Sequence, residues 1–161
     1  TVDVVATDHA PHTREEKEAT IAEAPSGVPG VETMLPLLLA TAASDDRLSY
    51  ERVRDLTATN PADVFGLERK GRIEEGRDAD LVLVDPDATR PIRGEDLHSN
   101  CEWTPFDGMD GVFPLATLRR GEVVYADPEA ATGEAAVDGL DEIAPADDVF
   151  GVAKGTDVRL S

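Results

Sequence analysis

Residues 2–12 read VDVVATDHAPH, a run of β-branched side chains that ends in a group of polar ones. The run at residues 2–7 predicts a short buried strand. Asp8 would then lie just past the carboxyl end of that strand, where α/β barrels carry their catalytic side chains. A carboxylate at such a point can bind a metal ion and can take a proton from water on the metal. Asp8 is therefore the first candidate for a metal ligand or an acid–base group.

Two histidines follow the carboxylate, one on each side of Pro11. A proline disfavours the helical region for the residue before it, so His9 and His12 should be spread apart by an extended turn. We therefore expect one side chain of this segment to bind a metal and another to face a substrate. A catalytic zinc site uses about three protein ligands, and the remaining histidine, His98, has no helpful spacing. The segment offers part of a metal site, and a structural loop network remains the alternative.

The chain continues with a charged loop and a helical region. Residues 13–30 read as a mobile loop with at most one helical turn. The apolar stretch from Val31 predicts a helix to about residue 43, with a proline tolerated in its first turn. Ser49 is the expected cap of a second helix, and Asn60 the expected cap of a third that ends before Gly66.

After residue 68 the apolar period changes to two, which is typical of strands. We expect strands at residues 79–85 and 114–119. A tight turn at Arg120 and Gly121 should lead into a third strand at residues 122–125 and close a hairpin.

Net charge is the strongest compositional signal. The chain has 161 residues and a formal charge of −19, with only three lysines against twelve arginines. Such a surface would repel nucleic acid and anionic membranes, and concentrated salt would screen its self-repulsion. We expect a halophilic source, with an ordinary acidic cytoplasmic protein as the alternative. The single cysteine, Cys101, suits a reducing compartment.

Several motifs together resemble one family. The segments ATDHAPHTREEK and APSGVPGVETMLPLLL, then TATNPADVFGL and KGRIEEGRDADLVLVD, and finally WTPFDGMDGVFPLATLRRGEVVY follow the order found in dihydroorotases, a family of cyclic amidohydrolases. The resemblance covers about residues 2–126. It implies the C-terminal portion of a metal-dependent hydrolase with a TIM-like (β/α)8 barrel and part of a small β-sandwich domain.

The resemblance also divides the chain and implies roles for particular residues. Residues 1–68 would supply the last barrel strand, the active-site loop and the final barrel helices, residues 69–126 the small β domain, and residues 127–161 an acidic tail. Asp8 would bind zinc and shuttle a proton, and His12 would contact the substrate carboxylate. The backbone of Ser26 and Gly27 would touch the substrate ring, and His9 would make a structural hydrogen bond.

The implied reaction is the reversible hydrolysis of (S)-dihydroorotate to N-carbamoyl-L-aspartate in de novo pyrimidine biosynthesis, by a zinc-activated hydroxide with Asp8 as acid and base. One or two zinc ions would be held by ligands lying mostly outside this chain, so the isolated chain should not catalyse. The partner is a small-molecule substrate, not nucleic acid or a membrane. Homo-oligomers and association with another pyrimidine-pathway enzyme stay open. The alternatives are a hydantoinase or allantoinase type of amidase and a non-catalytic scaffold subunit.

Overall fold

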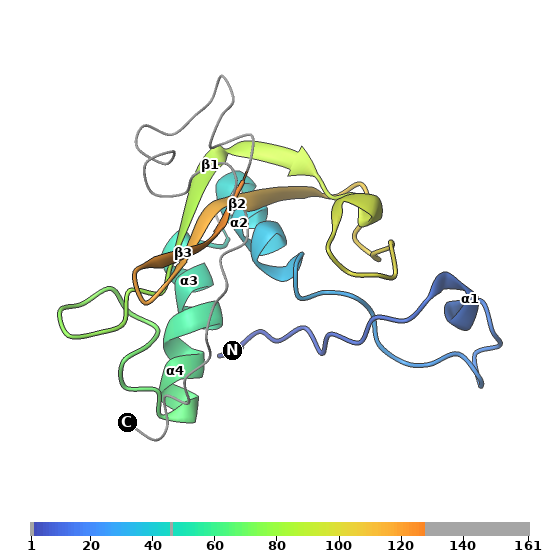
Figure 1. Cartoon of the computed structure of the whole chain (residues 1–161), viewed down its shortest axis with the longest axis horizontal. Coiled ribbons are helices and arrows are strands. Elements are labelled where there is room, and N and C mark those ends of the chain that lie inside the picture. The colour runs from blue at the N-terminus through green and yellow to red at the C-terminus, as the bar shows by residue number, and fades with distance from the viewer. Residues whose placement is uncertain (1, 46, 128–161) are drawn as a thin grey trace. The chain divides into compact units, whose positions relative to one another are not determined.

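The structure is a computed structural model that describes residues 2–45 and 47–127 (Figure 1). The acidic tail expected at residues 127–161 lies outside the described residues, apart from Asp127. Among the described residues, no helix is both long enough and apolar enough to cross a bilayer.

The described residues form two compact units. The first comprises residues 2–4, 54–85 and 114–127, and the second comprises residues 5–45, 47–53 and 86–113. The predicted division of the chain into barrel, β domain and tail stays a prediction.

Helix α2, Met34–Ser44, confirms the predicted apolar helix. Pro36 is its third residue, where a backbone N–H has no partner within the helix, so the missing donor costs little. Leu39 and Ala40 are buried. The loop before α2 contains one helical turn, α1 at Arg14–Lys17, as expected.

A longer helical run begins with α3, Tyr50–Arg54, and its predicted cap is confirmed because the Ser49 hydroxyl accepts the Arg52 N–H at 3.2 Å. The run continues through a π-helical segment, Asp55–Thr59, into α4, Asn60–Phe65. It ends as predicted at Gly66, whose φ is 66°.

The predicted cap at Asn60 is wrong. Its backbone N–H bonds to Asp55 O within the helical run, and its side-chain amide donates to Asp3 O at 2.8 Å. Pro61 cannot donate a backbone hydrogen bond, and a π-helical segment, a rare feature found mostly inside α-helices, lies directly before the Asn-Pro pair. The Asn-Pro pair therefore lies inside a helix.

The predicted strand at residues 2–7 is also not formed. Residues 2–8 carry no strand pairing, and the nearest pairing is an isolated parallel bridge between His9 and Val28. A strand exists only through hydrogen bonds to a neighbour. In the described part of the chain the sheet contains β1, β2 and β3 and does not include this segment.

The sheet contains β1, Leu81–Pro91, β2, Asp110–Arg119, and β3, Glu122–Ala126, in the order β1-β2-β3. All three predicted strands are confirmed; each is longer than predicted, and β1 begins two residues later than predicted. Strand β1 continues through Pro86, although a proline usually indicates a turn. The described sheet has β1 at its edge, and an edge strand tolerates proline.

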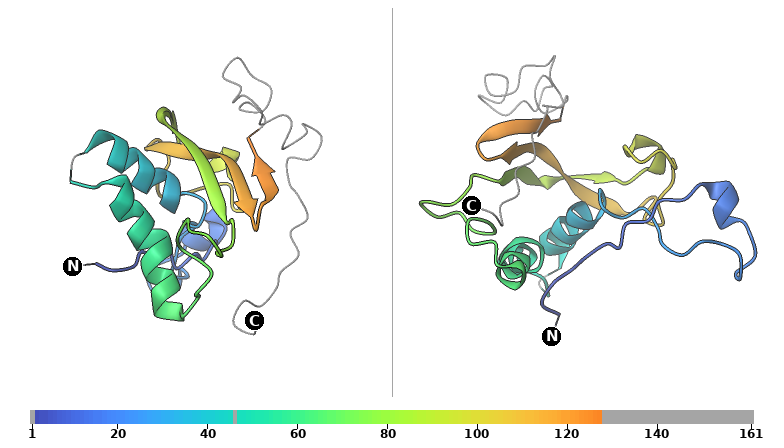
Figure 2. Two further views of the ribbon diagram at one scale, coloured as in Figure 1. Left: turned by 90° about the vertical axis from the view of Figure 1, so that its left-hand side faces the viewer. Right: turned by 60° about the horizontal axis from the view of Figure 1, so that its bottom comes forward.

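Strands β2 and β3 pair antiparallel and form a hairpin (Figure 2). Arg120 and Gly121 at its tip have φ values of 51° and 84°, as the predicted tight turn requires. The Asp127 N–H extends the pairing by donating to Leu115 O at 2.8 Å.

Candidate functional site

Asp8 has an uncommon conformation. Its φ is 46°, in the left-handed region that non-glycine residues rarely adopt and that is enriched at functional sites. The residue is exposed, and among residues 2–45 and 47–127 its carboxylate has no hydrogen-bond or ion-pair partner. The structure thus places the Asp8 carboxylate on a left-handed backbone turn, exposed and without such a partner among the described residues.

His9 fixes the turn that carries Asp8. Its Nδ1 accepts the backbone N–H groups of Gly30 at 3.1 Å and Val31 at 3.2 Å. An accepting nitrogen carries no proton, so a neutral His9 is protonated on Nε2. The structural hydrogen bond expected for His9 is confirmed, and its Nδ1 is not available to a metal.

The loop that contains Ser26 and Gly27 lies against the same turn. The Ala10 N–H donates to Val28 O at 3.1 Å. Gly27 has a φ of 94°, and a Cβ placed on it would lie 2.5 Å from the Ala10 Cβ, so this position requires glycine. Ser26 is exposed. The structure therefore brings the predicted substrate-contact pair beside the segment that follows Asp8.

His12 faces a carboxylate. Its Nδ1 lies 3.7 Å from Oε2 of Glu16. That oxygen accepts the Thr13 backbone N–H at 2.8 Å and the Thr13 hydroxyl at 3.1 Å. These two bonds, the backbone one foremost, lower the pKa of Glu16. The Glu16 N–H donates in return to the Thr13 hydroxyl at 3.2 Å. An anionic group is thus held beside the imidazole. The T-x-x-E spacing of this capping box is a signal that could have been found in the sequence.

Two further residues brace the site segments and were not predicted. The Trp103 indole N–H donates to His12 O at 2.6 Å. Lys17 Nζ donates to Pro25 O at 2.7 Å and to Gly27 O at 3.1 Å. Both contacts join side chains to distant backbone carbonyls, so no local spacing in the sequence signals them.

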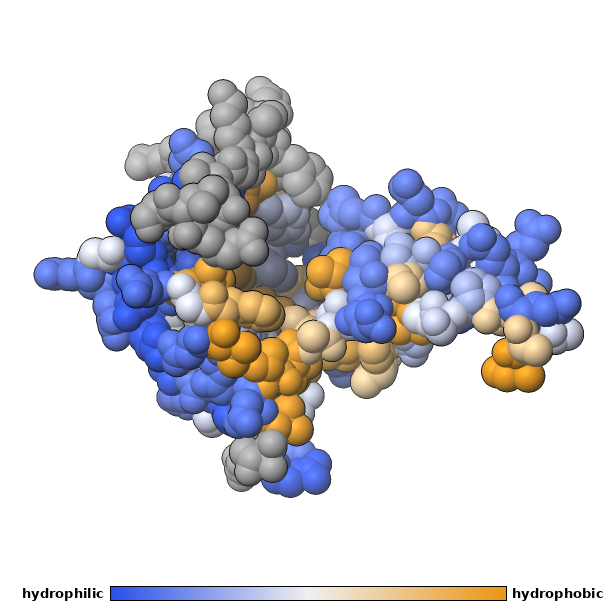
Figure 3. Space-filling view, turned by 90° about the horizontal axis from the view of Figure 1, so that it is seen from below, coloured by the Kyte–Doolittle hydropathy of each residue, from blue (hydrophilic) through white to orange (hydrophobic). Residues whose placement is uncertain are grey.

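An apolar hollow of about 260 Å³ lies beside the segment that leads to Asp8. Figure 3 shows apolar surface that is open on one face of the molecule. Such a lining favours packing against other apolar groups over polar chemistry. The hollow is lined by Val5, Ala6, Thr7, Val28, Gly30, Met34, Leu37, Leu38 and Phe106.

The donor set fits one ligand of a shared metal site rather than a whole site. The described residues contain no group of three or more His, Cys, Asp or Glu side chains that could hold an ion. His98 is bonded elsewhere, with its Nδ1 2.6 Å from Oε1 of Glu32. Asp8 has the chemistry to supply one ligand, since a carboxylate is an ordinary metal ligand.

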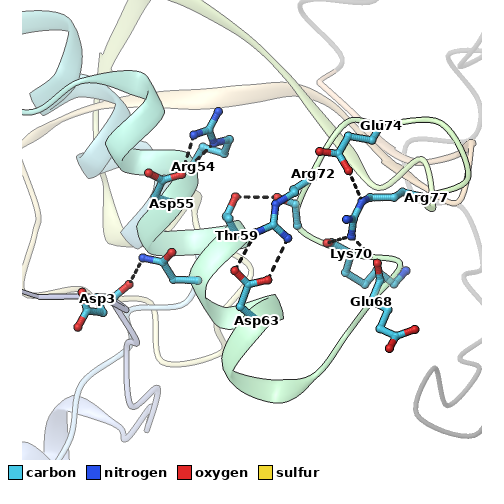
Figure 4. Close-up of polar contacts among 12 residues, drawn as sticks. Asp3, Arg54, Asp55, Thr59, Asp63, Glu68, Lys70, Arg72, Glu74 and Arg77 are labelled. Atoms are coloured by element: carbon cyan, nitrogen blue, oxygen red, sulfur yellow. Dashed lines mark hydrogen bonds and ion pairs between the residues drawn. The ribbon is translucent and has the colours of Figure 1, made fainter.

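The first unit has a contrasting polar group, which we name the return-loop cluster and which comprises Asp63, Arg69, Lys70, Arg72 and Asp78. Arg72 makes two bonds to Asp63, at 2.9 and 2.7 Å, as Figure 4 shows. Asp78 lies 2.7 Å from Arg69 and 2.9 Å from Lys70. Each carboxylate has a cationic partner, so the cluster stabilises the loop that follows α4.

Hydrogen bonds shift the pKa values of several residues of the cluster, among them Asp78 and Lys70. The bonds from Lys70 and then Arg69 lower the pKa of Asp78. Partial burial acts to lower the pKa of Lys70, but its bonds to Asp78 and Asp80 outweigh burial and raise it. Both shifts stabilise the charged forms, which fits a structural role.

Comparison with known proteins gives consistent results. A sequence model of the amidohydrolase family matches residues 3–124. A dihydroorotase of Halobacterium salinarum is 74% identical over 124 residues, which are 77% of this chain and 29% of that protein. A dihydroorotase of Methanosarcina acetivorans is 54% identical over 127 residues, covering 78% of this chain and 27% of that protein.

Solved structures agree with this result. An L-hydantoinase (dihydropyrimidinase) from Arthrobacter aurescens superposes with a TM-score of 0.72 at 35% identity, over 77% of this chain and 29% of that one. A D-hydantoinase (dihydropyrimidinase) from Thermus sp. gives 0.73 at 35% identity, over 78% and 28%. The chain therefore spans less than a third of the length of these relatives. The similarity to a protein of a halophilic archaeon agrees with the acidic, lysine-poor composition.

Proposed function

This chain belongs to the amidohydrolase family, and we propose that it provides the proton-transfer and substrate-contact segments of a dihydroorotase. The observation that carries the proposal is the Asp8 carboxylate, which has no partner within residues 2–45 and 47–127 and is held on a left-handed turn between two braced segments. The identities to named dihydroorotases support this substrate. The close approach of Gly27 to Ala10, two residues after Asp8, supports the proposal that Ser26 and Gly27 contact the same substrate.

The proposed reaction opens the cyclic amide of (S)-dihydroorotate to N-carbamoyl-L-aspartate, reversibly. Metal dependence is general in the family, and Asp8 would hold the metal together with ligands outside this chain. When bound, a zinc ion would supply Lewis acidity at the reacting carbonyl.

Each residue has a separate task in this proposal. Asp8 accepts the proton of the attacking water and delivers it to the leaving ring nitrogen. His12 donates a hydrogen bond to the substrate carboxylate, a charge-assisted contact that fixes the orientation of the ring. The backbone of Ser26 and Gly27 bonds to the edge of the ring. The bonds that His9 accepts and Trp103 donates hold the Asp8 and His12 segments, so that these two side chains need little rearrangement.

The finer fold belongs to the same proposal. In the full-length protein, neighbouring barrel strands would supply the pairing partners that residues 2–7 lack among the described residues, and the segment up to Asp8 would be the last strand of a TIM-like barrel. The side chains that line the apolar hollow would pack against neighbouring barrel elements. The similarity to hydantoinases over 77–78% of this chain supports this placement. Residues 69–126 would form the small β domain, and the enzyme would act in the cytoplasm.

A substrate panel tests the proposal with the full-length protein that contains this chain. We expect rapid hydrolysis of dihydroorotate and little of dihydrouracil, hydantoin or allantoin. The superposition on hydantoinases favours a second candidate, a cyclic amidase for uncharged rings, which the reverse preference would establish. Hydrolysis of none of these compounds by the metal-loaded protein would instead indicate a scaffold subunit.

A further inference from the structure

Lys17 is distinct among the charged side chains of its segment. Residues 13–16 and 18–20 are exposed, whereas Lys17 is half-buried. Its ammonium donates to the carbonyl oxygens of Pro25 and Gly27, the residues on either side of Ser26. The chain contains few lysines, and a compact ammonium with several donors suits two nearby carbonyls better than the planar fork of an arginine.

The contact with Pro25 determines where the next N–H points. The described chain contains no cis peptide bond. In a planar trans peptide the N–H points opposite to the preceding C=O. Because the Pro25 C=O is directed at the ammonium, the N–H of Ser26 is directed away from it. The same relation directs the N–H of Val28 away from Lys17 through the Gly27 C=O.

The loop is held at other points by the segment that follows Asp8. The Ala10 N–H bonds to Val28 O, and Gly27 packs against Ala10 so closely that a Cβ would clash. Lys17 adds a tether to the part of the loop that contains Ser26. Without the ammonium, the carbonyls of Pro25 and Gly27 would lose these donors and could turn toward water.

We propose that Lys17 is a positioning residue that orients the Ser26 and Gly27 backbone toward a cyclic amide substrate. The proposal rests on the proposed function, in which this pair contacts the ring. Lys17 acts through the loop and does not touch the reacting atoms. Its loss should therefore weaken substrate binding more than the chemical step.

Steady-state kinetics of the full-length, metal-loaded enzyme test this role. Lys17→Met keeps the stem and removes the donors, and we expect KM for dihydroorotate to rise about tenfold while kcat changes less than about threefold. Lys17→Arg restores donors in a less suitable geometry and should give an intermediate KM. Arg14→Met, in the same helical turn, removes an exposed cation and should leave both constants unchanged.

Hydrogen exchange supplies a readout that does not depend on activity. Backbone amides of residues 24–31 should exchange faster in Lys17→Met than in the wild type or in Arg14→Met. An unchanged KM together with unchanged exchange would overturn the proposal, as would a loss of kcat at constant KM. If the wild type fails to hydrolyse dihydroorotate, the proposed function fails, while the exchange result still decides whether Lys17 holds the loop.

Discussion

Two loops of this chain are stabilised in opposite ways. In the return-loop cluster full charges face one another, as in the paired bonds between Arg72 and Asp63. In the segment around Asp8, most of the bonds end on backbone groups: His9 accepts two N–H groups, and Trp103 donates to a carbonyl. The first loop uses its carboxylates for structure. The second holds its backbone by other means, and among the described residues its Asp8 carboxylate has no hydrogen-bond or ion-pair partner. This difference is the one expected if the second loop carries the proposed chemistry.

Exchanging a carboxylate for an amide in each loop should give the largest contrast. In the full-length enzyme, Asp8→Asn should lower kcat about a thousandfold, because an amide cannot accept the proton. Asp78→Asn should leave kcat unchanged and lower the melting temperature. Full activity of Asp8→Asn would show that this carboxylate is not the acid and base, and an equal loss in both variants would remove the distinction between the loops.

A glycine pair gives the next largest effect. Gly27 and Gly76 have similar positive φ values, 94° and 85°, but a Cβ would clash only at Gly27, since nothing lies within 4 Å at Gly76. Both alanine variants should lose about 1–2 kcal/mol through backbone strain. Gly27→Ala should also raise KM for dihydroorotate about tenfold by displacing the loop. Equal KM values in the two variants would contradict a role for the Gly27 contact in substrate binding.

Trp103→Phe should have a smaller effect on the same constant. Phenylalanine keeps an aromatic ring and removes the indole donor to His12 O. The loss of one neutral hydrogen bond should cost about 1 kcal/mol of binding free energy, which corresponds to a rise in KM of about fivefold. Steady-state kinetics check this value, and thermal melting controls for loss of packing. An unchanged KM would show that Trp103 does not position His12.

Lys70→Met should change stability slightly and leave KM unchanged. The pKa of Asp78 is lowered and that of Lys70 is raised. The contribution of Asp78 is therefore present above its unfolded pKa and is lost as pH falls through its lower folded pKa. The contribution of Lys70 is present below its unfolded pKa and is lost as pH rises through its higher folded pKa.

The melting temperatures of the wild type and Lys70→Met should therefore differ by a few degrees near neutral pH and converge at strongly acid and strongly alkaline pH. A difference that persists at strongly acid pH would show that the ion pairs are not its source.

The predictions from sequence succeeded where structure is local. The turn at Arg120 and Gly121 and the cap at Ser49 depend on residues a few positions apart, and both were predicted. Asn60 was misassigned because the π-helical segment before it has no sequence signature that marks a continuing helix. The strand at residues 2–7 depends on pairing partners that its own sequence cannot specify.

In the candidate site, too, contacts between distant segments could not be predicted from the sequence. Asp8 and His12 were identified as candidates from their own segment and a family resemblance. Lys17 and Trp103 were missed because their bonds end on backbone carbonyls of other segments, which any residue type could supply. Side-chain chemistry could therefore be inferred from the sequence, whereas the bracing of the loop required the structure.

The most direct test concerns the charge of the substrate. In the full-length enzyme, kcat/KM should be measured for dihydroorotate and for its uncharged methyl ester, in the wild type and in His12→Ala. We predict that His12→Ala lowers kcat/KM for dihydroorotate at least about tenfold, as expected for a lost charge-assisted hydrogen bond, and leaves that for the ester within about twofold. An equal loss for both substrates, or no loss for either, would contradict the assignment of this segment to carboxylate recognition in a dihydroorotase.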